Sequence, residues 1–253
     1  MSQRFLCLFL LVACSYSCKK ENFKPVEISS KRFSIDSNIP SETSIANFIK
    51  PYSEHINRSL DSTIAFNPLN LDKKDGELNT ALGNLMADIV MEQANLPFKD
   101  QTGKEIDIVL LNHGGIRAAI DKGPVTARTA YQLMPFENEI VVAELTGNRI
   151  KEMIAYLENN RTAHPISGMT IKMDEDFKVI NAEVQNLPIE DEKKYFVATS
   201  DYLQQGGDNM IFLKDPVNLY RTGYKIRNAI IDYFNKIDTI QTQRDGRYIR
   251  ITN

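Results

Sequence analysis

The chain has 253 residues, of which 42% are hydrophobic and 25% charged, and 30 Lys and Arg against 33 Asp and Glu give a formal net charge of -3. These values are ordinary for a globular protein and exclude a disordered chain, a coiled coil, a collagen-like fibre and a protein with many membrane spans. A charge this close to neutral gives no electrostatic reason to expect nucleic acid as a partner.

The first 17 residues have the features of a secretory signal peptide. Arg4 supplies a positive charge, residues 5–13 form an unbroken apolar run, and small or polar residues follow. The run is too short to cross a bilayer, which takes roughly 20 apolar residues. A buried terminal strand or short helix is the alternative interpretation. We expect residues 1–17 to be a lipoprotein-type signal peptide.

All three cysteines lie in or beside this segment, so no disulfide bond is expected in the rest of the chain. A cysteine that follows an apolar run resembles the lipid-attachment site of bacterial lipoproteins. Cys18 is the preferred lipidated residue, and Cys14 is an alternative because residues 11–14 also fit the pattern. Lipidation predicts a secreted protein that is anchored to a membrane, in the periplasm or at the cell surface.

Residues 18–40 are polar, contain two prolines and indicate a flexible tether, which places the folded domain at residues 41–253. The apolar spacing predicts a helix over residues 41–60, with Pro51 as a bend, and then a strand at 63–66. A turn-rich stretch leads to a helix at 79–94 and a buried strand at 106–111.

In the second half of the chain, predicted strands and helices follow one another in a less regular order. A strand at 139–145 precedes a helix at 146–158 that Thr146 is expected to cap, and strands follow at 169–173, 179–184 and 195–199. After a glycine-ended turn at 201–208, the pattern predicts a helix at 224–235 and a strand at 247–251. Because there is no strict βαβ repeat, we expect an α+β fold in packed layers.

The first candidate site is the loop Asn-His-Gly-Gly-Ile-Arg at residues 112–117, directly after the buried strand. Adjacent glycines let a backbone approach a ligand closely. Arg117 can donate paired hydrogen bonds to a carboxylate or phosphate. Taken alone, the loop is more often a tight turn with a solvated arginine.

Two further loops carry aromatic residues. Phe136, in residues 134–138, is a candidate stacking platform, although such a residue is more often part of a core. In residues 201–208, Tyr202 is a candidate second platform and Asp208 a candidate acceptor for sugar hydroxyls. A helix end with a glycine cap and a turn aspartate is the alternative interpretation of that loop.

In order and spacing, these loops resemble the C-terminal, substrate-binding domain of the 5′-nucleotidase family, which includes periplasmic UDP-sugar hydrolases. The resemblance runs from roughly Pro51 to Ile251. It is also carried by the 82–88 helix, the Leu-Thr-Gly at 145–147, Ser-Gly at 167–168 and Gly-Arg at 246–247. It implies the layered mixed α/β domain of that family.

The resemblance also implies residue roles in nucleotide or nucleoside recognition. The base would lie between the rings of Phe136 and Tyr202, and Asp208 would bind the ribose hydroxyls. Stacking on an aromatic ring is worth about 1–3 kcal/mol per base and tolerates different bases. Asn112 and Arg117 would lie near the phosphate, and Asn138 near the base. The implied substrate-binding residues are Asn112, Gly114, Gly115, Arg117, Phe136, Asn138, Tyr202 and Asp208.

One segment departs from the family. Its members usually carry phosphate-gripping arginines shortly before the helix that holds Gly83 and Asn84, whereas residues 75–80 contain none here. Lys73 and Lys74 are near but do not match position by position. The sequence therefore supports recognition of the nucleoside better than recognition of the phosphate.

Full-length members of the family have a separate N-terminal metallophosphatase domain with two metal ions. This chain offers only His55, His113 and His164, none in a metal-ligand pattern, and no Ser–His–Asp or Cys–His set is evident. His55 is expected at the surface, and His113 takes a position that is usually glycine, which makes it a further candidate for ligand contact. We expect no catalytic residue, metal or other cofactor in this chain.

Two functions follow. Either the chain is the recognition part of a 5′-nucleotidase in nucleotide catabolism, whose phosphomonoester hydrolysis needs a separate metallophosphatase with divalent metals, or it is a non-catalytic surface lipoprotein that captures nucleosides or nucleotides. A domain that only scaffolds an assembly is a third, structural interpretation.

Overall fold

The structure is a computed structural model that describes residues 29–251. The predicted signal peptide and both candidate lipidation cysteines lie outside these residues. The chain divides between Ile49 and Lys50 into two units. Residues 29–42 contain no helix or strand, and helix α2 (Thr43–Leu60) begins where the apolar spacing predicts it. Pro51 lies inside α2, and the helix buries none of its residues.

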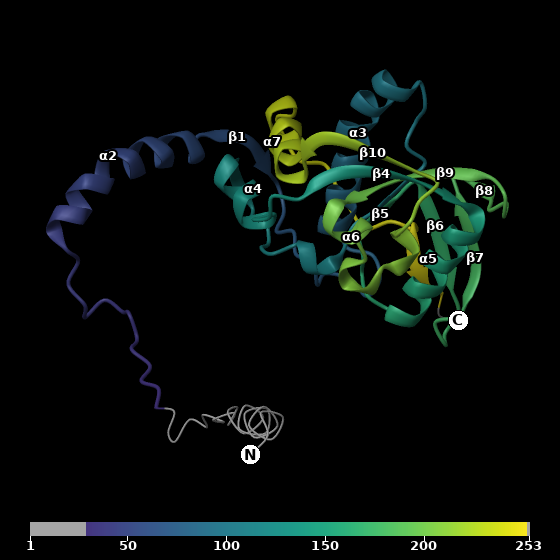
Figure 1. The fold of residues 1–253 in the computed structure, drawn as a ribbon, viewed down its shortest axis with the longest axis horizontal. Coiled ribbons are helices and arrows are strands. Elements are labelled where there is room, and N and C mark those ends of the chain that lie inside the picture. Colours follow the sequence, from purple (N-terminus) through teal and green to yellow (C-terminus); the bar gives the residue numbers. More distant parts are fainter. Residues whose placement is uncertain (1–28, 252–253) are drawn as a thin grey trace, which may run out of the picture. The chain divides into compact units, whose positions relative to one another are not determined.

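A five-stranded mixed sheet forms the centre of the second unit (Figure 1). Its strands, in spatial order, are β10 (Asn218–Lys225), β4 (Glu139–Thr146), β9 (Lys194–Ser200), β2 (Ile108–Leu110) and β5 (Ile166–Ser167). The β2–β9 pair is parallel and the other pairs are antiparallel. The α+β class predicted from the sequence is therefore confirmed.

Both faces of this sheet are buried, because side chains alternate along each strand. Val109 and Ala198 belong to one apolar cluster, and their neighbours Ile108 and Val197 belong to the other. The first cluster is covered by α3 (Ala81–Thr102), α4 (Ala127–Leu133) and α7 (Ile226–Lys236). The second lies under α5 (Gly147–Asn160) and a second sheet, on the other side in Figure 1.

The second sheet has the order β11 (Tyr248–Arg250), β6 (Met169–Met173), β7 (Val179–Val184), β8 (Leu187–Pro188). A separate pair joins β1 (Thr63–Asn67) to β3 (Gly123–Thr126). Short helical turns complete the unit: α6 (Asp201–Gln204), η1 (His113–Gly115), η2 (Gly207–Asn209) and η3 (Ile211–Leu213). In the part of the chain that the structure describes, no helix has both the length and the apolar character needed to cross a membrane.

Helix α3 is longer than predicted, since it continues past residue 94 through Pro97 to Thr102. The ring of the buried Phe98 lies 5.4 Å from the rings of both Phe196 and Tyr220, and this packing outweighs the hydrogen bond that the proline removes. Gly103 then ends the helix in a left-handed conformation, at φ 71°.

Three further predictions need correction. Thr146 precedes α5 as expected, but its side chain makes no capping hydrogen bond. The turn predicted at 201–208 contains the helical turns α6 and η2. The segment before β4, for which no helix or strand was predicted, holds β3 and α4. Strand β10 was missed altogether because none of its residues is buried and it shows no apolar alternation.

Candidate functional site

Three loops meet at one edge of the central sheet. β2 and β9 are parallel, so their carboxyl ends lie together, and the antiparallel β4 brings its amino end to the same edge, where Ile140 pairs with Ser200. Residues 112–117 follow β2, residues 134–138 precede β4, and residues 201–208 follow β9. The topology therefore gathers segments that are far apart in sequence.

These loops enclose a cavity of about 360 Å³. A volume of roughly 300–1,000 Å³ is usual for small-molecule sites. Its lining consists of all eight residues that the sequence predicts for ligand binding: Asn112, Gly114, Gly115, Arg117, Phe136, Asn138, Tyr202 and Asp208. Their grouping is a structural fact, whereas their binding roles stay a prediction.

Asp208 connects two sides of the cavity. Its Oδ1 accepts a hydrogen bond from the Tyr202 hydroxyl at 2.8 Å, and its Oδ2 accepts one from Asn112 Nδ2 at 2.7 Å. The Asp208 backbone has a left-handed conformation with φ 52°. The hydrogen bond to the carboxylate raises the pKa of the Tyr202 hydroxyl. The network holds an acidic group in a fixed place on the cavity wall.

Two glycines lie directly against side chains that line the cavity. A Cβ atom at Gly207 would lie 2.5 Å from carbon atoms of the Tyr202 ring, so the ring rests directly on the backbone there. A Cβ atom at Gly115 would lie 2.7 Å from Oδ1 of Asn112. At both positions the absence of a Cβ atom leaves room for a side chain of the cavity.

The two aromatic side chains are partly open to solvent, with 39% of Phe136 and 47% of Tyr202 exposed. Within the described residues the two rings make no direct contact with each other. The guanidinium carbon of Arg117 lies 5.9 Å from the centre of the Phe136 ring, and Arg117 Nη1 donates to the Gly114 carbonyl at 3.3 Å. Such an arrangement leaves ring surface available to a planar group.

Helix α7 anchors the Phe136 loop, a role that sequence reasoning missed. The nearly buried Arg227 donates to the Phe136 carbonyl at 3.3 Å and pairs with Glu137. Hydrogen bonds from Lys225, which has the largest effect, and from Arg227 lower the pKa of Glu137 to about 2. The Ile226 amide also donates to the Asn138 carbonyl at 3.0 Å. These contacts join positions about ninety residues apart, and no local sequence motif predicts them.

Lys73, which the sequence left unmatched, supports the glycine loop from outside the cavity. Its Nζ donates to the Ile116 carbonyl at 2.7 Å and to the His113 carbonyl at 3.4 Å. Burial lowers the pKa of Lys73, and the nearby positive charge of Arg117 lowers it further. Arg117 is the one cationic side chain among the eight that line the cavity.

The three histidines do not share a site. His55 lies exposed on α2, as predicted. His113, the further candidate for ligand contact, is not among the residues that line the cavity, and its ring Nδ1 lies 3.2 Å from the Ala163 carbonyl. His164 is buried. Among residues 29–251, no three His, Cys, Asp or Glu side chains are arranged to hold a metal ion.

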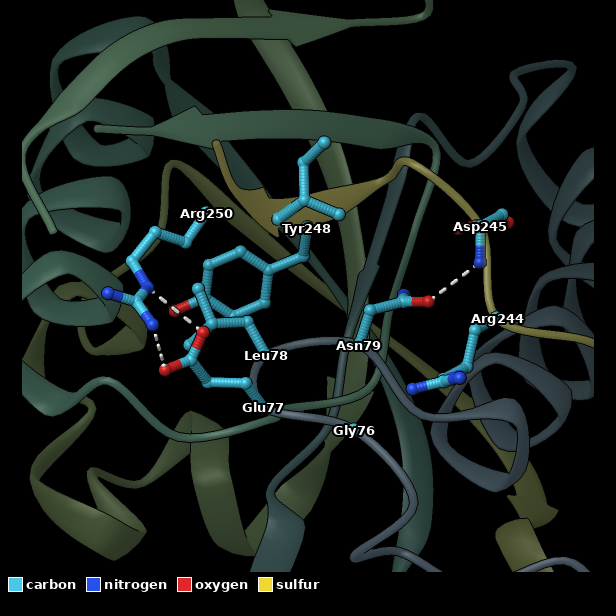
Figure 2. Close-up of a pocket in the computed structure, with 9 residues that line it drawn as sticks. Gly76, Glu77, Leu78, Asn79, Arg244, Asp245, Tyr248 and Arg250 are labelled. Carbon is cyan, nitrogen blue, oxygen red and sulfur yellow. Dashed lines mark hydrogen bonds and ion pairs between the residues drawn. The ribbon is translucent and has the colours of Figure 1, made fainter. Parts of the chain in front are cut away.

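A second cavity, of about 370 Å³, lies between residues 76–79 and 244–250 (Figure 2). Figure 2 shows the Arg250 side chain paired with Glu77, and Asn79 joined to the Asp245 backbone. Arg250 forms two hydrogen bonds with the Glu77 carboxylate, at 2.9 and 3.0 Å, and the Asp245 amide donates to Asn79 Oδ1 at 2.8 Å. None of the predicted binding residues lines it.

Residues 55–215 match the family model described as "5'-nucleotidase, C-terminal domain". The chain belongs to the 5′-nucleotidase C-terminal domain family. The match covers all three loops of the cavity, so the family resemblance read from the motifs is confirmed.

Known members support this assignment. The chain is 34% identical over 183 residues to the trifunctional nucleotide phosphoesterase protein YfkN of Bacillus subtilis (strain 168). The aligned part covers 66% of this chain and 12% of YfkN. It is 27% identical over 238 residues to a 5′-nucleotidase of Vibrio vulnificus (strain CMCP6), and this alignment covers 87% of this chain and 40% of the Vibrio protein.

A solved member has the same fold. The crystal structure of a 5′-nucleotidase precursor from Thermus thermophilus superposes with a TM-score of 0.67 and 26% identity, over 85% of this chain and 44% of that one. The chain thus spans less than half the length of these relatives.

Proposed function

We propose that the cavity at the edge of the central sheet binds nucleosides or nucleotides, and that the chain is the recognition part of a 5′-nucleotidase. The observation that carries this proposal is the placement of two partly exposed aromatic rings and one carboxylate on the wall of a single cavity of about 360 Å³. Aromatic rings that stay open to solvent inside a cavity are suited to stacking on bases.

The ligand would use each part of the wall. The base stacks on Phe136 and Tyr202, with Asn138 beside it. The ribose hydroxyls donate to Asp208, because a carboxylate has about four acceptor positions and Tyr202 and Asn112 use only two. The phosphate lies toward Arg117, whose guanidinium group can donate paired hydrogen bonds.

Hydrolysis is proposed to take place on a metallophosphatase domain or chain with divalent metals, which would present an activated water to the bound nucleotide. Two observations support this division: the match to the C-terminal domain, and the relatives' greater length. The experiment measures phosphate release from AMP with Mn²⁺, Mg²⁺ or Zn²⁺. We expect none from this chain alone and turnover once a metallophosphatase from the same cell is added. Robust turnover by the chain alone would contradict the division.

Capture of nucleosides without hydrolysis is the second candidate. It is favoured because Arg117 is the one cation lining the cavity, while Lys73 donates to backbone carbonyls instead. Calorimetry separates the two functions. Binding of adenosine at least as tight as that of AMP, without any partner protein, would favour capture.

We also propose that the protein is a lipoprotein held at a membrane outside the cytoplasm through Cys18 or Cys14. The apolar run followed by cysteine supports this location. Mass spectrometry of the mature amino terminus should find a diacylglyceryl cysteine at one of the two positions. An unmodified amino terminus would contradict the proposal.

A further inference from the structure

Two side chains behind the candidate cavity touch its two sides without lining it. His164 Nδ1 accepts a hydrogen bond from the backbone N–H of His113 at 3.3 Å, on the glycine loop. The Tyr156 hydroxyl, on α5, donates to the Asp208 carbonyl at 2.9 Å. The rings of Tyr156 and His164 pack together, with their centres 5.7 Å apart. A continuous path of contacts therefore joins the glycine loop to the Asp208 turn.

The bond to His113 fixes the chemical state of His164. An imidazole nitrogen that accepts a hydrogen bond carries no proton, so the proton of neutral His164 must lie on Nε2. Protonation of Nδ1 would replace the acceptor by a donor that faces the donor N–H of His113. The bond exists only while His164 is neutral.

The surroundings of His164 keep it neutral. Only 6% of the residue is exposed, and burial lowers its pKa to about 4. After burial, the next largest cause of this low pKa is the charged form of His113, whereas the Leu111 carbonyl and then the Asp208 carboxylate act in the opposite direction. Burial also lowers the pKa of His113 and raises that of Tyr156.

The relative position of the glycine loop and the Asp208 turn matters for the cavity wall. One hydrogen bond, from Asn112 Nδ2 to Asp208 Oδ2, joins these two sides of the wall. A shift of the glycine loop would move Asn112, and a shift of the turn would move Asp208, whose φ of 52° is unfavourable for a residue with a side chain. Each side therefore needs its own anchor.

We infer that His164 and Tyr156 are positioning residues that hold the glycine loop and the Asp208 turn in register for ligand binding. His164 anchors residues 112–117 through the His113 amide, and Tyr156 anchors Asp208 through its carbonyl. As a statement about ligand binding, the inference rests on the proposed nucleoside function.

The first test needs no ligand. Amide hydrogen exchange over residues 113–117 is compared in the wild-type chain and in the His164→Leu and His164→Asn variants. Loss of the acceptor should speed exchange by about tenfold in His164→Leu, since the half-buried His113 N–H then has no partner in His164. Asparagine places an oxygen near the Nδ1 position and should restore slow exchange. His55→Asn, at an exposed histidine of α2, is the matched control and should change nothing there.

The second test adds adenosine, followed by calorimetry. Wild type and His164→Asn should bind alike, and His164→Leu and Tyr156→Phe should each bind about tenfold more weakly. If the exchange pattern holds but wild type does not bind adenosine, the anchoring is supported and the nucleoside proposal fails. If wild type binds and His164→Leu binds equally well, the inference is overturned.

Two results guard against a variant that does not fold. Exchange in His164→Asn that is as fast as in His164→Leu over residues 113–117, while amides of the central sheet exchange as slowly as in the wild type, would overturn the inference by itself. NMR of the imidazole nitrogens in the wild-type chain at neutral pH should show Nδ1 without a proton and Nε2 with one. A proton on Nδ1 would also overturn it.

Discussion

The hydroxyl of Tyr202 donates a hydrogen bond to Oδ1 of Asp208 at 2.8 Å, which joins the aromatic and the acidic part of the cavity wall. A phenylalanine at this position would stack equally well but could not make this bond. The hydroxyl therefore has a positioning role that can be separated from stacking.

The Tyr202→Phe variant should bind adenosine more weakly by about 0.5–1.5 kcal/mol, the usual net value of one hydrogen bond. Tyr202→Ala should lose about 1–3 kcal/mol of stacking in addition. Calorimetry measures both. A Phe variant that binds worse than the Ala variant would contradict this separation.

Phe136 should contribute stacking from the opposite loop. Phe136→Ala is expected to weaken adenosine binding by about 1–3 kcal/mol. Phe33, an exposed phenylalanine in the irregular stretch before α2, provides the control, and Phe33→Ala should bind normally. Equal affinity of the Phe136 and Phe33 variants would remove Phe136 from the site.

Gly207 tests whether the position of the Tyr202 ring matters. A methyl group there would lie 2.5 Å from the ring and force it to move, which should weaken adenosine binding by about 1–3 kcal/mol in Gly207→Ala. Gly246 is the matched control, because nothing lies within 4 Å of a Cβ atom built on it. Normal binding by Gly207→Ala would show that the ring position is unimportant.

The edge of the central sheet explains why the eight predicted residues line one cavity. Each of the three loops carries its own local signal: paired glycines, a proline-flanked Phe136, and Tyr202 followed by Asp208. The parallel pairing of β2 with β9 and the antiparallel pairing of β4 with β9 then bring the three loops together without any further information from the loops themselves.

Contacts made over long separations were not predictable. The anchor from Arg227 to Phe136 joins α7 to a loop before β4, because β10 ends at the same edge, where Lys225 pairs with Glu139. Strand β10 itself was not predicted because its residues show no alternation of apolar and polar side chains. The course of α3 through Pro97 depends on the packing of Phe98, which no window of sequence contains.

The buried His164 makes the stability of the fold depend on pH. Its pKa is about 4 in the folded chain against an ordinary 6.5, so the unfolded chain binds the proton more tightly. Above about pH 6.5, His164 is neutral in both states and does not change the free energy of unfolding with pH. As the pH falls from 6.5 toward 4, the unfolded chain is protonated first, and the free energy of unfolding drops by roughly 3 kcal/mol in all.

Urea unfolding between pH 7.5 and pH 4 measures this loss. His164→Asn should lose less stability over that range than the wild-type chain, whereas His55→Asn should follow the wild type. An identical pH dependence of His164→Asn and wild type would show that His164 does not titrate as described.

A crystal structure of the chain with adenosine tests the central claim most directly. We expect the base between the rings of Phe136 and Tyr202, with the ribose hydroxyls within hydrogen-bonding distance of Asp208. Adenosine bound in the cavity of Figure 2, or a base that touches neither ring, would contradict it.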